Sequence, residues 1–347
     1  MCTSVTRLAF ERNVCRILGA ALLAMSAVAV VAAAEPREKT EFGTNPGNLR
    51  MFSYLPPDVA PGAPLIVVLH GCKQKAVTFA REAGWLALAD RSRLALLLPE
   101  QKGLPTYLHD VYVIPGVVAL WGANNQNACF NWFEPDDTAR DRGEALSIRQ
   151  MIDAMVEQHS IDPSRVYIVG FSAGGAMTAA MLAAYPDRFA GGAVVAGVPY
   201  GCADSVHQAL QCMNPGIDQA PAEWHRRVRE MAGAEGRMPP VSIWHGTNDS
   251  RVVLRNWQEL IEQWTAVHGI AAKPARGERH GSVTRQFYTD GAGAVRVESV
   301  LVEGLPHGFP IRIGGDGFCG RPGNFIIAAD VCATTEIAHF WGLRIDH

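Results

Sequence analysis

The chain has 347 residues, of which 48% are hydrophobic and 19% are charged, and its formal net charge is −3. This composition excludes a disordered chain, because it offers enough apolar surface for a large folded core. The sequence has no basic run that could follow a phosphate backbone, so we expect no nucleic-acid partner.

The N-terminus has the composition of an export signal. Arginines within the first 16 residues precede an apolar run, 17–31, and the small residues 32–34 then offer a cleavage site. The apolar run is shorter than the roughly 20 residues that a membrane-spanning helix needs. We therefore predict that 1–34 is a signal peptide and that the mature chain is secreted, to the extracellular space or the periplasm, without stable membrane association. An uncleaved membrane anchor is the alternative.

Beyond this segment, short apolar runs alternate with longer amphipathic stretches. Apolar and β-branched runs predict strands at 64–69, 94–98, 166–169, 192–196, 241–244 and 295–302. Apolar residues at helical spacing predict helices at 79–91, 145–158, 174–185, 257–267 and 334–343. The alternation predicts an α/β protein with a mostly parallel, doubly wound sheet and helices on both faces.

We expect residues 35–347 to form a single domain, because no linker rich in Ser, Thr, Pro or Gly divides them. The stretch 199–240 is poor in strand pattern and contains two cysteines. It is therefore expected to be a cap-like excursion over the top of the sheet rather than a separate module.

One serine lies on the turn between a predicted strand and a predicted helix. The segment Gly170-Phe-Ser-Ala-Gly174 matches the pattern G-x-S-x-G, and its small residues let the strand and the helix approach closely. The turn would raise the Ser172 hydroxyl above the sheet, near the positive end of the helix dipole. This context is typical of the nucleophile elbow of the α/β-hydrolase fold. We predict Ser172 as the nucleophile; an inert serine in a glycine-rich turn is the alternative.

A serine nucleophile needs a base within hydrogen-bond reach, and the base needs an acid to orient it. In this fold the acid and then the histidine follow the serine along the chain. Asp249 follows the strand 241–244 at a glycine turn, and His307 follows the strand 295–302 in a Pro/Gly turn. We therefore predict Asp249 as the acid and His307 as the base; an Asx turn and a structural turn histidine are the alternatives.

Other residues of the same types fit this order less well. Three carboxylates precede the serine: Asp136, Asp137 and Asp141. The remaining histidines after the acid lie at a helix end, in a charged stretch, inside the closing helix and at the terminus: His268, His280, His339 and His347.

The oxyanion of an acyl-transfer intermediate needs two backbone donors. We expect one donor to be the N–H of Ala173, directly after the serine, and the other to be the N–H of Cys72, in the loop after the first buried strand. His70 lies in the same loop and is expected to shape it rather than to act as a base.

Aromatic residues are candidates for the walls of a substrate pocket. We expect Trp132 and Trp244 there, with Trp121 and Phe133 as further candidates, and core packing is the alternative for each. The sequence has no CxxC pair and no HExxH motif, so no metal is expected. The predicted chemistry needs no cofactor.

Six of the eight cysteines follow the predicted signal peptide, and an even number in an exported chain indicates disulfides. The number of pairings that six cysteines allow means that the sequence alone does not fix the connectivity. The shortest loop closures are Cys202–Cys212 and Cys319–Cys332, and these would leave Cys72 with Cys129.

Taken together, these segments resemble the polyhydroxybutyrate-depolymerase family of esterases. The resemblance extends from about residue 48 to the end, and it is carried by His70-Gly-Cys-Lys-Gln74, Cys129-Phe-Asn-Trp-Phe133, Gly170-Phe-Ser-Ala-Gly-Gly-Ala-Met177, His245-Gly-Thr-Asn-Asp249 and His307. It implies a secreted serine esterase with this triad, and a disulfide between Cys72 and Cys129. Family members act on polyhydroxyalkanoates, feruloyl esters and acetylated plant polysaccharides.

The chain also departs from the family pattern. Depolymerases of this family usually carry a linker and a polymer-binding domain, which this sequence lacks, so soluble or short-chain esters are favoured over crystalline polymer. Phe171 stands where the family often has Leu.

We therefore predict a secreted serine carboxylic-ester hydrolase that acts through an acyl-enzyme on short-chain hydroxyalkanoate, feruloyl or acetyl esters. A serine peptidase on the same fold and a secreted binding protein without chemistry are the alternatives. The sequence predicts no oligomeric state.

Overall fold

The computed structural model describes residues 34–57, 59–109, 118, 122–233, 237–315 and 317–345. Glu35–His347 form one compact unit. Apart from Ala34, the predicted signal peptide lies outside the described residues. Among the described helices, none combines the length and the apolar character that a bilayer-spanning segment requires.

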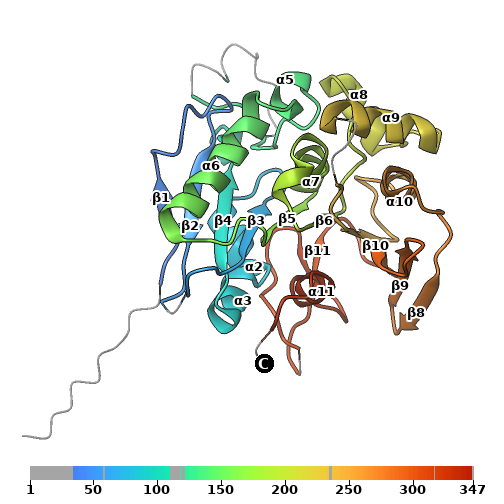
Figure 1. Cartoon of the computed structure of the whole chain (residues 1–347). Coiled ribbons are helices and arrows are strands. Elements are labelled where there is room, and N and C mark those ends of the chain that lie inside the picture. The colour runs from blue at the N-terminus through green and yellow to red at the C-terminus, as the bar shows by residue number, and fades with distance from the viewer. Residues whose placement is uncertain are drawn as a thin grey trace, which may run out of the picture. The chain divides into compact units, whose positions relative to one another are not determined.

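A ten-stranded sheet runs through the described part of the chain, with the order β1-β2-β4-β3-β5-β6-β7-β10-β9-β8 (Figure 1). The strands from β4 to β10 in this order are parallel, and the strands at both edges are antiparallel. Their bounds are β1 Arg37–Lys39, β2 Arg50–Tyr54, β3 Leu65–Leu69, β4 Ala95–Glu100, β5 Val166–Phe171, β6 Gly191–Val195, β7 Val241–Gly246, β8 Arg276–His280, β9 Val283–Thr289 and β10 Val295–Val302. The predicted mostly parallel α/β sheet is confirmed.

Helices lie on both faces of this sheet (Figure 1). One group, α6, α7 and α10, packs on one face, and α2, α3 and α11 form the other group. The bounds of the described helices, including α5, α8 and α9, are α2 Ala76–Glu82, α3 Trp85–Ser92, α5 Pro135–Thr138, α6 Gly143–His159, α7 Ala173–Ala184, α8 Val206–Met213, α9 Pro221–Ala232, α10 Arg255–His268 and α11 Ala333–Phe340. Two short 3₁₀ turns, Thr106–Leu108 and Pro186–Arg188, and a small parallel pair, β11 Phe309–Ile311 and β12 Ile326–Ala328, complete the described elements.

Strand β3 shows why the central strands read as unbroken apolar runs. Leu65, Val67 and Leu69 belong to the core cluster that the sheet shares with α6, α7, α9 and α10. Ile66 and Val68 are equally buried but point to the opposite face, because successive side chains alternate across a strand. Because helices cover both of its sides, none of the five positions of β3 is polar.

The predicted helix at 79–91 is wrong in one respect: the segment forms two helices, α2 and α3. They are separated at Gly84, whose φ of +89° belongs to the left-handed region that glycine adopts without strain. A Cβ at Gly84 would lie 3.0 Å from the backbone nitrogen of Gly320, so a close approach of the C-terminal loop also requires glycine here.

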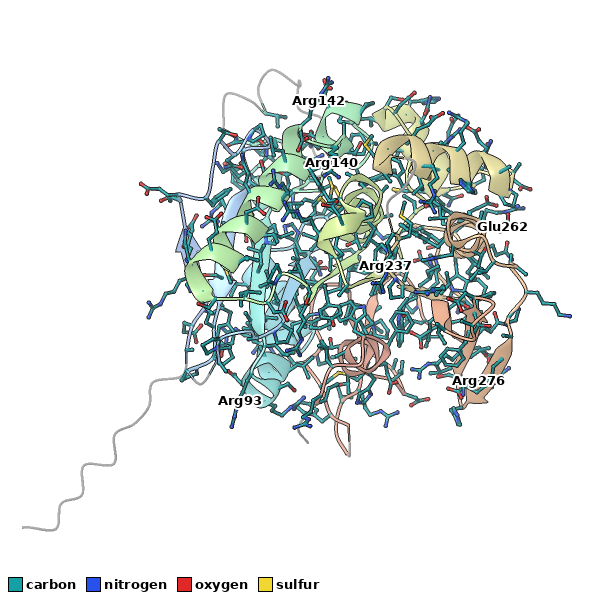
Figure 2. All side chains as sticks on the ribbon, viewed as in Figure 1. Arg93, Arg140, Arg142, Arg237, Glu262 and Arg276 are labelled. Atoms are coloured by element: carbon teal, nitrogen blue, oxygen red, sulfur yellow. A yellow bond between two sulfur atoms is a disulfide. The ribbon has the colours of Figure 1, made fainter. Side chains whose placement is uncertain are left out.

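The edge strands lie outside the predicted set. In β8 the sequence Arg-Gly-Glu-Arg-His has mostly exposed side chains, so it lacks the apolar alternation that marks a half-buried strand. Such a polar edge strand also resists pairing with other chains. Charged side chains such as Arg93, Arg142 and Arg276 project outward from the ribbon (Figure 2).

The stretch 199–240, which we expect to be a cap-like excursion, contains the helices α8 and α9. The disulfide Cys202–Cys212 closes its first half. In α9 the indole N–H of Trp224 donates to the buried carboxylate of Glu259 in α10, at 2.8 Å. The contact between Trp224 and Glu259 joins α9 to α10, and Met213, the last residue of α8, lines the same cavity as Ser172 and His307.

The turn between β5 and α7 depends on close backbone packing. A Cβ added at Gly174 would lie 2.4 Å from the carbonyl oxygen of Leu69 and 2.5 Å from that of His70. The first turn of α7 therefore lies directly against the end of β3, as the small residues of the sequence pattern predict.

We expect Gly174→Ala to lower the free energy of unfolding by at least about 2 kcal/mol, because the overlap has to be relieved by moving backbone. Gly291→Ala is the matched control, since nothing lies within 4 Å of a Cβ there. Urea unfolding of both variants measures the difference, and equal midpoints would contradict the close packing of α7 on β3.

A buried acid, Glu298, links the three neighbouring strands β7, β10 and β9. Glu298 in β10 accepts a hydrogen bond from the Ser242 hydroxyl of β7 and lies 3.2 Å from Arg285 Nε of β9. Burial raises the pKa of Glu298 to about 7, although Arg285 and Ser242 oppose the shift. Because the folded protein holds this proton more tightly than the unfolded chain, the stabilisation is complete below about pH 4.5 and is lost as the pH rises through about 7.

We expect Glu298→Gln to gain stability relative to the wild type as the pH rises from about 5 to about 8, by up to about 3 kcal/mol. The amide cannot lose a proton and so escapes the desolvation cost. Glu303→Gln, at an exposed position, is the control. Urea unfolding at the two pH values gives the comparison; a pH-independent difference for Glu298→Gln would show that the buried acid does not titrate in this range.

Candidate active site

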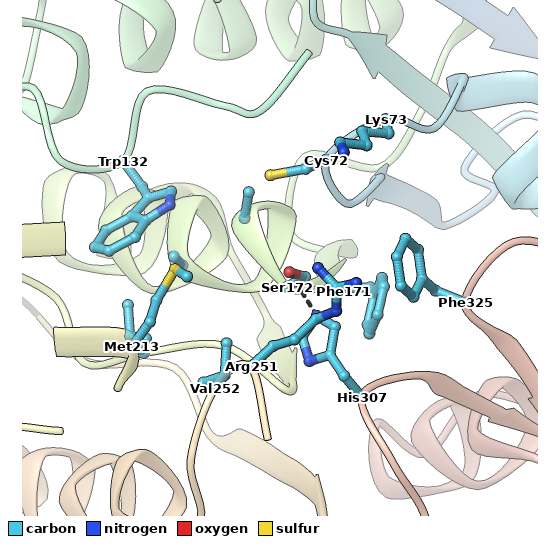
Figure 3. Close-up of a pocket in the computed structure, with 13 residues that line it drawn as sticks. Cys72, Lys73, Trp132, Phe171, Ser172, Met213, Arg251, Val252, His307 and Phe325 are labelled. Carbon is cyan, nitrogen blue, oxygen red and sulfur yellow. Dashed lines mark hydrogen bonds between the residues drawn. The ribbon is translucent and has the colours of Figure 1, made fainter. Parts of the chain in front are cut away.

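Ser172 lies where β5 ends and α7 begins, at the carboxyl edge of the parallel strands. Its backbone has φ +55° and ψ −119°, a conformation that costs energy for any residue with a side chain. The hydroxyl Oγ is 2.9 Å from Nε2 of His307 (Figure 3). The strained turn thus presents the hydroxyl to an imidazole that comes from a distant part of the chain.

His307 bridges the serine and an acid. Its Nδ1 lies 2.7 Å from Oδ2 of Asp249, so the tautomer protonated at Nδ1 donates to the carboxylate and leaves Nε2 free to accept from the serine. The imidazole packs against two aromatic rings, with centroid distances of 5.0 Å to Phe171 and 5.9 Å to Phe325, and these two rings are 6.4 Å from each other. Phe171, which departs from the family pattern, therefore forms one wall for the histidine.

Asp249 is buried on the turn after β7, and backbone groups hold it in place. Its Oδ1 accepts hydrogen bonds from the N–H groups of Arg251 and Val252, both at 2.9 Å. Burial raises the pKa of Asp249, but the hydrogen bond and the charge of His307 outweigh this and leave it below its usual value. The acid is therefore ionised near neutral pH.

A second histidine lies beside the acid. His245 is fully buried. Its Nε2 lies 2.8 Å from the carbonyl oxygen of Val252 and 3.6 Å from Oδ2 of Asp249. Burial lowers the pKa of His245, so the ring is neutral near pH 7. Its Nδ1 has no hydrogen-bond partner among the described residues. His245 thus supports the turn that carries the acid.

The two residues expected to supply oxyanion donors come from separate segments that line one cavity. Ala173 is the first residue of α7, where the helix has no internal acceptor for the N–H. Cys72 lies in the loop after β3 and lines the same cavity. This loop is tied down by the disulfide Cys72–Cys129 and by the bond from Lys73 N–H to the carbonyl of Asn127, at 2.7 Å.

His70 stabilises that loop, in agreement with the sequence analysis. Its Nδ1 is 2.7 Å from the carbonyl of Gly71, and its Nε2 accepts the N–H of Gln101 at 3.1 Å. Both nitrogens are engaged by backbone groups, and the ring is fully buried. The side chain has no contact with the serine.

A cavity of about 190 Å³ opens at this site (Figure 3). Its wall is mainly apolar, and the described residues that line it are Cys72, Lys73, Trp132, Phe171, Ser172, Ala173, Ala176, Val198, Met213, Arg251, Val252, His307 and Phe325. Trp132, which the sequence analysis expects in the wall of a substrate pocket, is among these lining residues. The serine, the histidine and both candidate oxyanion residues therefore line one cavity.

The expectation that Trp244 lines the pocket is wrong. Its side chain is buried on one face of the sheet, where the indole N–H donates to the hydroxyl of Ser242, at 2.8 Å. The hydroxyl in turn donates to Glu298. The alternation of the strand turns this ring to the face that carries the polar chain and away from the cavity. Trp121 lies outside the described residues.

A buried polar network holds Trp132 at the cavity. The preceding residue, Asn131, donates its backbone N–H to Oε2 of Glu144 at 2.9 Å and its side-chain amide to Asp137 at 3.0 Å. Gln101 donates to the other oxygen of Glu144. Burial and the neighbouring charge of Asp137 raise the pKa of Glu144 well above its usual value. This network fixes the turn on which the tryptophan stands.

Sequence reasoning missed several residues of the cavity. Met213 ends the short helix α8 and Phe325 lies in a turn, and no recognisable motif marks either residue as part of a cavity. Arg251 could have been found, because it follows the predicted acid by two residues on the same turn. Among the described residues, no group of three or more His, Cys, Asp or Glu side chains is arranged to hold a metal ion.

All three predicted disulfides are present: Cys72–Cys129, Cys202–Cys212 and Cys319–Cys332. Each lies in or beside a segment that contributes to the cavity. The first joins the Cys72 loop to the segment of Trp132, and the third closes the loop that carries Phe325.

Comparison with solved structures supports this fold. An acetyl xylan esterase from Aspergillus awamori superimposes with a TM-score of 0.71 at 20% sequence identity, covering 89% of this chain and all of that chain. At this identity the similarity shows the fold, which is consistent with an α/β hydrolase.

Comparison with sequences gives the family. Residues 49–113 and 117–288 match the family model described as Esterase PHB depolymerase. Poly(3-hydroxyalkanoate) depolymerase C of Paucimonas lemoignei is 41% identical over 324 residues, which are 93% of this chain and 73% of the relative. Feruloyl esterase B of Thermothelomyces thermophilus is 32% identical over 298 residues, 84% of this chain and 92% of the relative. The chain therefore belongs to the polyhydroxybutyrate-depolymerase family of esterases.

Proposed function

We propose that this esterase hydrolyses carboxylic esters through a triad of Ser172, His307 and Asp249. The proposal is carried by the two consecutive hydrogen bonds of the histidine, 2.9 Å to the serine oxygen and 2.7 Å to the carboxylate. A hydroxyl, an imidazole and a buried carboxylate in this order are the arrangement that makes serine nucleophilic near neutral pH.

The reaction has two stages. As Ser172 Oγ attacks the ester carbonyl, its proton passes to Nε2 of His307, and Asp249 stabilises the imidazolium that forms. Collapse of the tetrahedral intermediate breaks the bond to the alcohol oxygen, which takes the proton from His307. Water then attacks the acyl-enzyme by the same route and releases the acid and the free serine.

The N–H groups of Ala173 and Cys72 are the proposed oxyanion donors. Both residues line the cavity beside the serine oxygen, and the N–H of Ala173 lies at the positive end of α7. The disulfide at Cys72 would keep this loop in place as negative charge develops, so that no reorganisation is needed during the reaction.

The proposed substrates are short-chain hydroxyalkanoate esters or feruloyl and acetyl esters. The relatives include enzymes named for a poly(3-hydroxyalkanoate), for feruloyl esters and for acetylxylan. The cavity of about 190 Å³ with a mainly apolar wall suits a short acyl chain. We also propose that the enzyme is secreted, on the basis of its N-terminal sequence and its three disulfides.

Replacing Ser172 by Ala should abolish hydrolysis of p-nitrophenyl butyrate and labelling by a fluorophosphonate probe, because the only proposed nucleophile is removed. The free energy of unfolding should change by less than about 1 kcal/mol. Steady-state rates and gel-based labelling provide the measurements. A folded Ser172→Ala protein with wild-type turnover would refute the proposed nucleophile.

Asp249→Asn should lower kcat on the order of 10⁴-fold. The N–H groups of Arg251 and Val252 would keep the amide oxygen, so the amide NH2 would face Nδ1 as a donor and the histidine would lose its tautomer. The exposed Asp204→Asn is the matched control and should retain wild-type kcat. Rates with p-nitrophenyl butyrate test both. A fall of less than tenfold for Asp249→Asn would argue against its role as the triad acid.

The substrate class is tested by one panel of p-nitrophenyl esters of increasing chain length, methyl ferulate, acetylated xylan and polyhydroxybutyrate films. We expect the highest kcat/KM on short acyl chains, because the cavity is small. Faster release of product from the solid film than from soluble esters would contradict this preference.

A further inference from the structure

Arg251 lies at the mouth of the cavity beside the triad (Figure 3). Its own backbone N–H donates to Asp249, at 2.9 Å, so the turn that orients the acid also fixes the point from which the arginine side chain leaves the backbone. The guanidinium carbon lies 5.1 Å from the centre of the Phe325 ring. A cation is thereby held in a defined position close to the reacting serine.

The charge of Arg251 has no counter-ion in the described part of the chain. None of the described carboxylates lies within 4.0 Å of its guanidinium. The described residues that line the cavity include the cations Lys73 and Arg251 and no acidic side chain. A guanidinium that rests on an aromatic face keeps its N–H edge available, and that edge matches a carboxylate in a two-point hydrogen bond.

Phe325, on which the guanidinium rests, is itself fixed. Its backbone has φ +59°, unusual for a large residue, within the loop that Cys319–Cys332 closes. The carbonyl of the preceding Asn324 accepts from the side chain of Gln74, at 2.6 Å, and the same side chain accepts the N–H of Gly71. The ring is thus tied to the loop that carries the proposed oxyanion donor.

The two ends of the cavity differ in chemistry. Trp132 and Met213 form an apolar end, whereas Arg251 and Phe325 lie at the end of His307 (Figure 3). The leaving alcohol must lie beside Nε2 of His307, because that nitrogen gives it its proton. An acyl chain would therefore occupy the apolar end and the alcohol portion of the ester the cationic end.

We propose that Arg251, supported by Phe325, binds a carboxylate carried by the alcohol portion of the substrate. This rests on the proposed ester hydrolysis at Ser172 and narrows its substrate class to soluble oligomers of hydroxy acids with a free carboxyl end. Attack breaks the bond between the acyl carbon and the alcohol oxygen nearest that end, and the alcohol leaves with the proton of His307 as a free hydroxy acid. The carboxylate itself stays unchanged throughout.

The test compares two substrates that differ in one charge: the dimer of 3-hydroxybutyrate with its free carboxylate, and the same dimer with a carboxamide in its place. Hydrolysis of the central ester is followed by chromatography. We expect kcat/KM of the wild type to favour the carboxylate by about tenfold, mainly through KM. Arg251→Gln should bring this ratio close to one, and Arg251→Lys should restore part of it.

Arg279→Gln is the matched control, since this exposed arginine lies on β8 and pairs with Glu303, outside the cavity. Its ratio should equal that of the wild type. Higher ionic strength should also reduce the wild-type ratio, which keeps the test valid if the Arg251 variants fail to fold. A wild-type ratio near one, or a ratio unchanged in Arg251→Gln, overturns the carboxylate site. Absence of p-nitrophenyl butyrate hydrolysis by the wild type would instead overturn the proposed function itself.

Discussion

The hydrogen bond between Nδ1 of His307 and Oδ2 of Asp249 joins two loops that leave neighbouring parallel strands, and the site depends on it. Because β7 and β10 pair in register and run in the same direction, the turns after them meet at one edge of the sheet. Residues 58 positions apart in sequence are thereby placed within bonding distance. The sheet fixes the strand ends, and the hydrogen bond fixes the side chains.

Ser172 reaches the same edge from β5, two strands further along the sheet. Gly174 allows the first turn of α7 to lie directly against the end of β3, so the serine and the Cys72 loop come together. The cost of the strained backbone at Ser172 is offset by the burial of α7, every residue of which is buried. The packing of α7 thus maintains the strained backbone that exposes the Ser172 hydroxyl.

The pattern of the sequence predicts this arrangement well where a residue follows a buried strand. Ser172, Asp249 and His307 each stand just after an apolar run, and in a parallel sheet such positions converge without any knowledge of long-range contacts. The pattern fails for Trp244, because the sequence shows that the tryptophan is in a strand but not which face it points to. The alternation of the strand relative to the helices decides that, and helices cover both faces of this sheet (Figure 1).

Cavity residues that carry no motif are a different case. Met213 ends the short helix α8 and Phe325 lies in a turn, so the approach of both to the cavity depends on contacts that only the folded chain makes. Arg251 is partly predictable. Its position near the site follows from its place two residues after Asp249, but the sequence does not show that its side chain lies over Phe325, more than 70 positions away.

Disulfides supply the constraint that the sheet cannot give to these loops. One bridge closes on the Cys72 loop, a second ends beside Met213, and the third encloses Phe325. A loop held only by its ends would lose conformational entropy whenever it ordered around substrate, whereas a cross-linked loop has lost much of that entropy before substrate arrives. The disulfides therefore restrain the loops around the cavity, and the paired strands restrain the strand ends beneath it. Together they keep the small cavity in one shape.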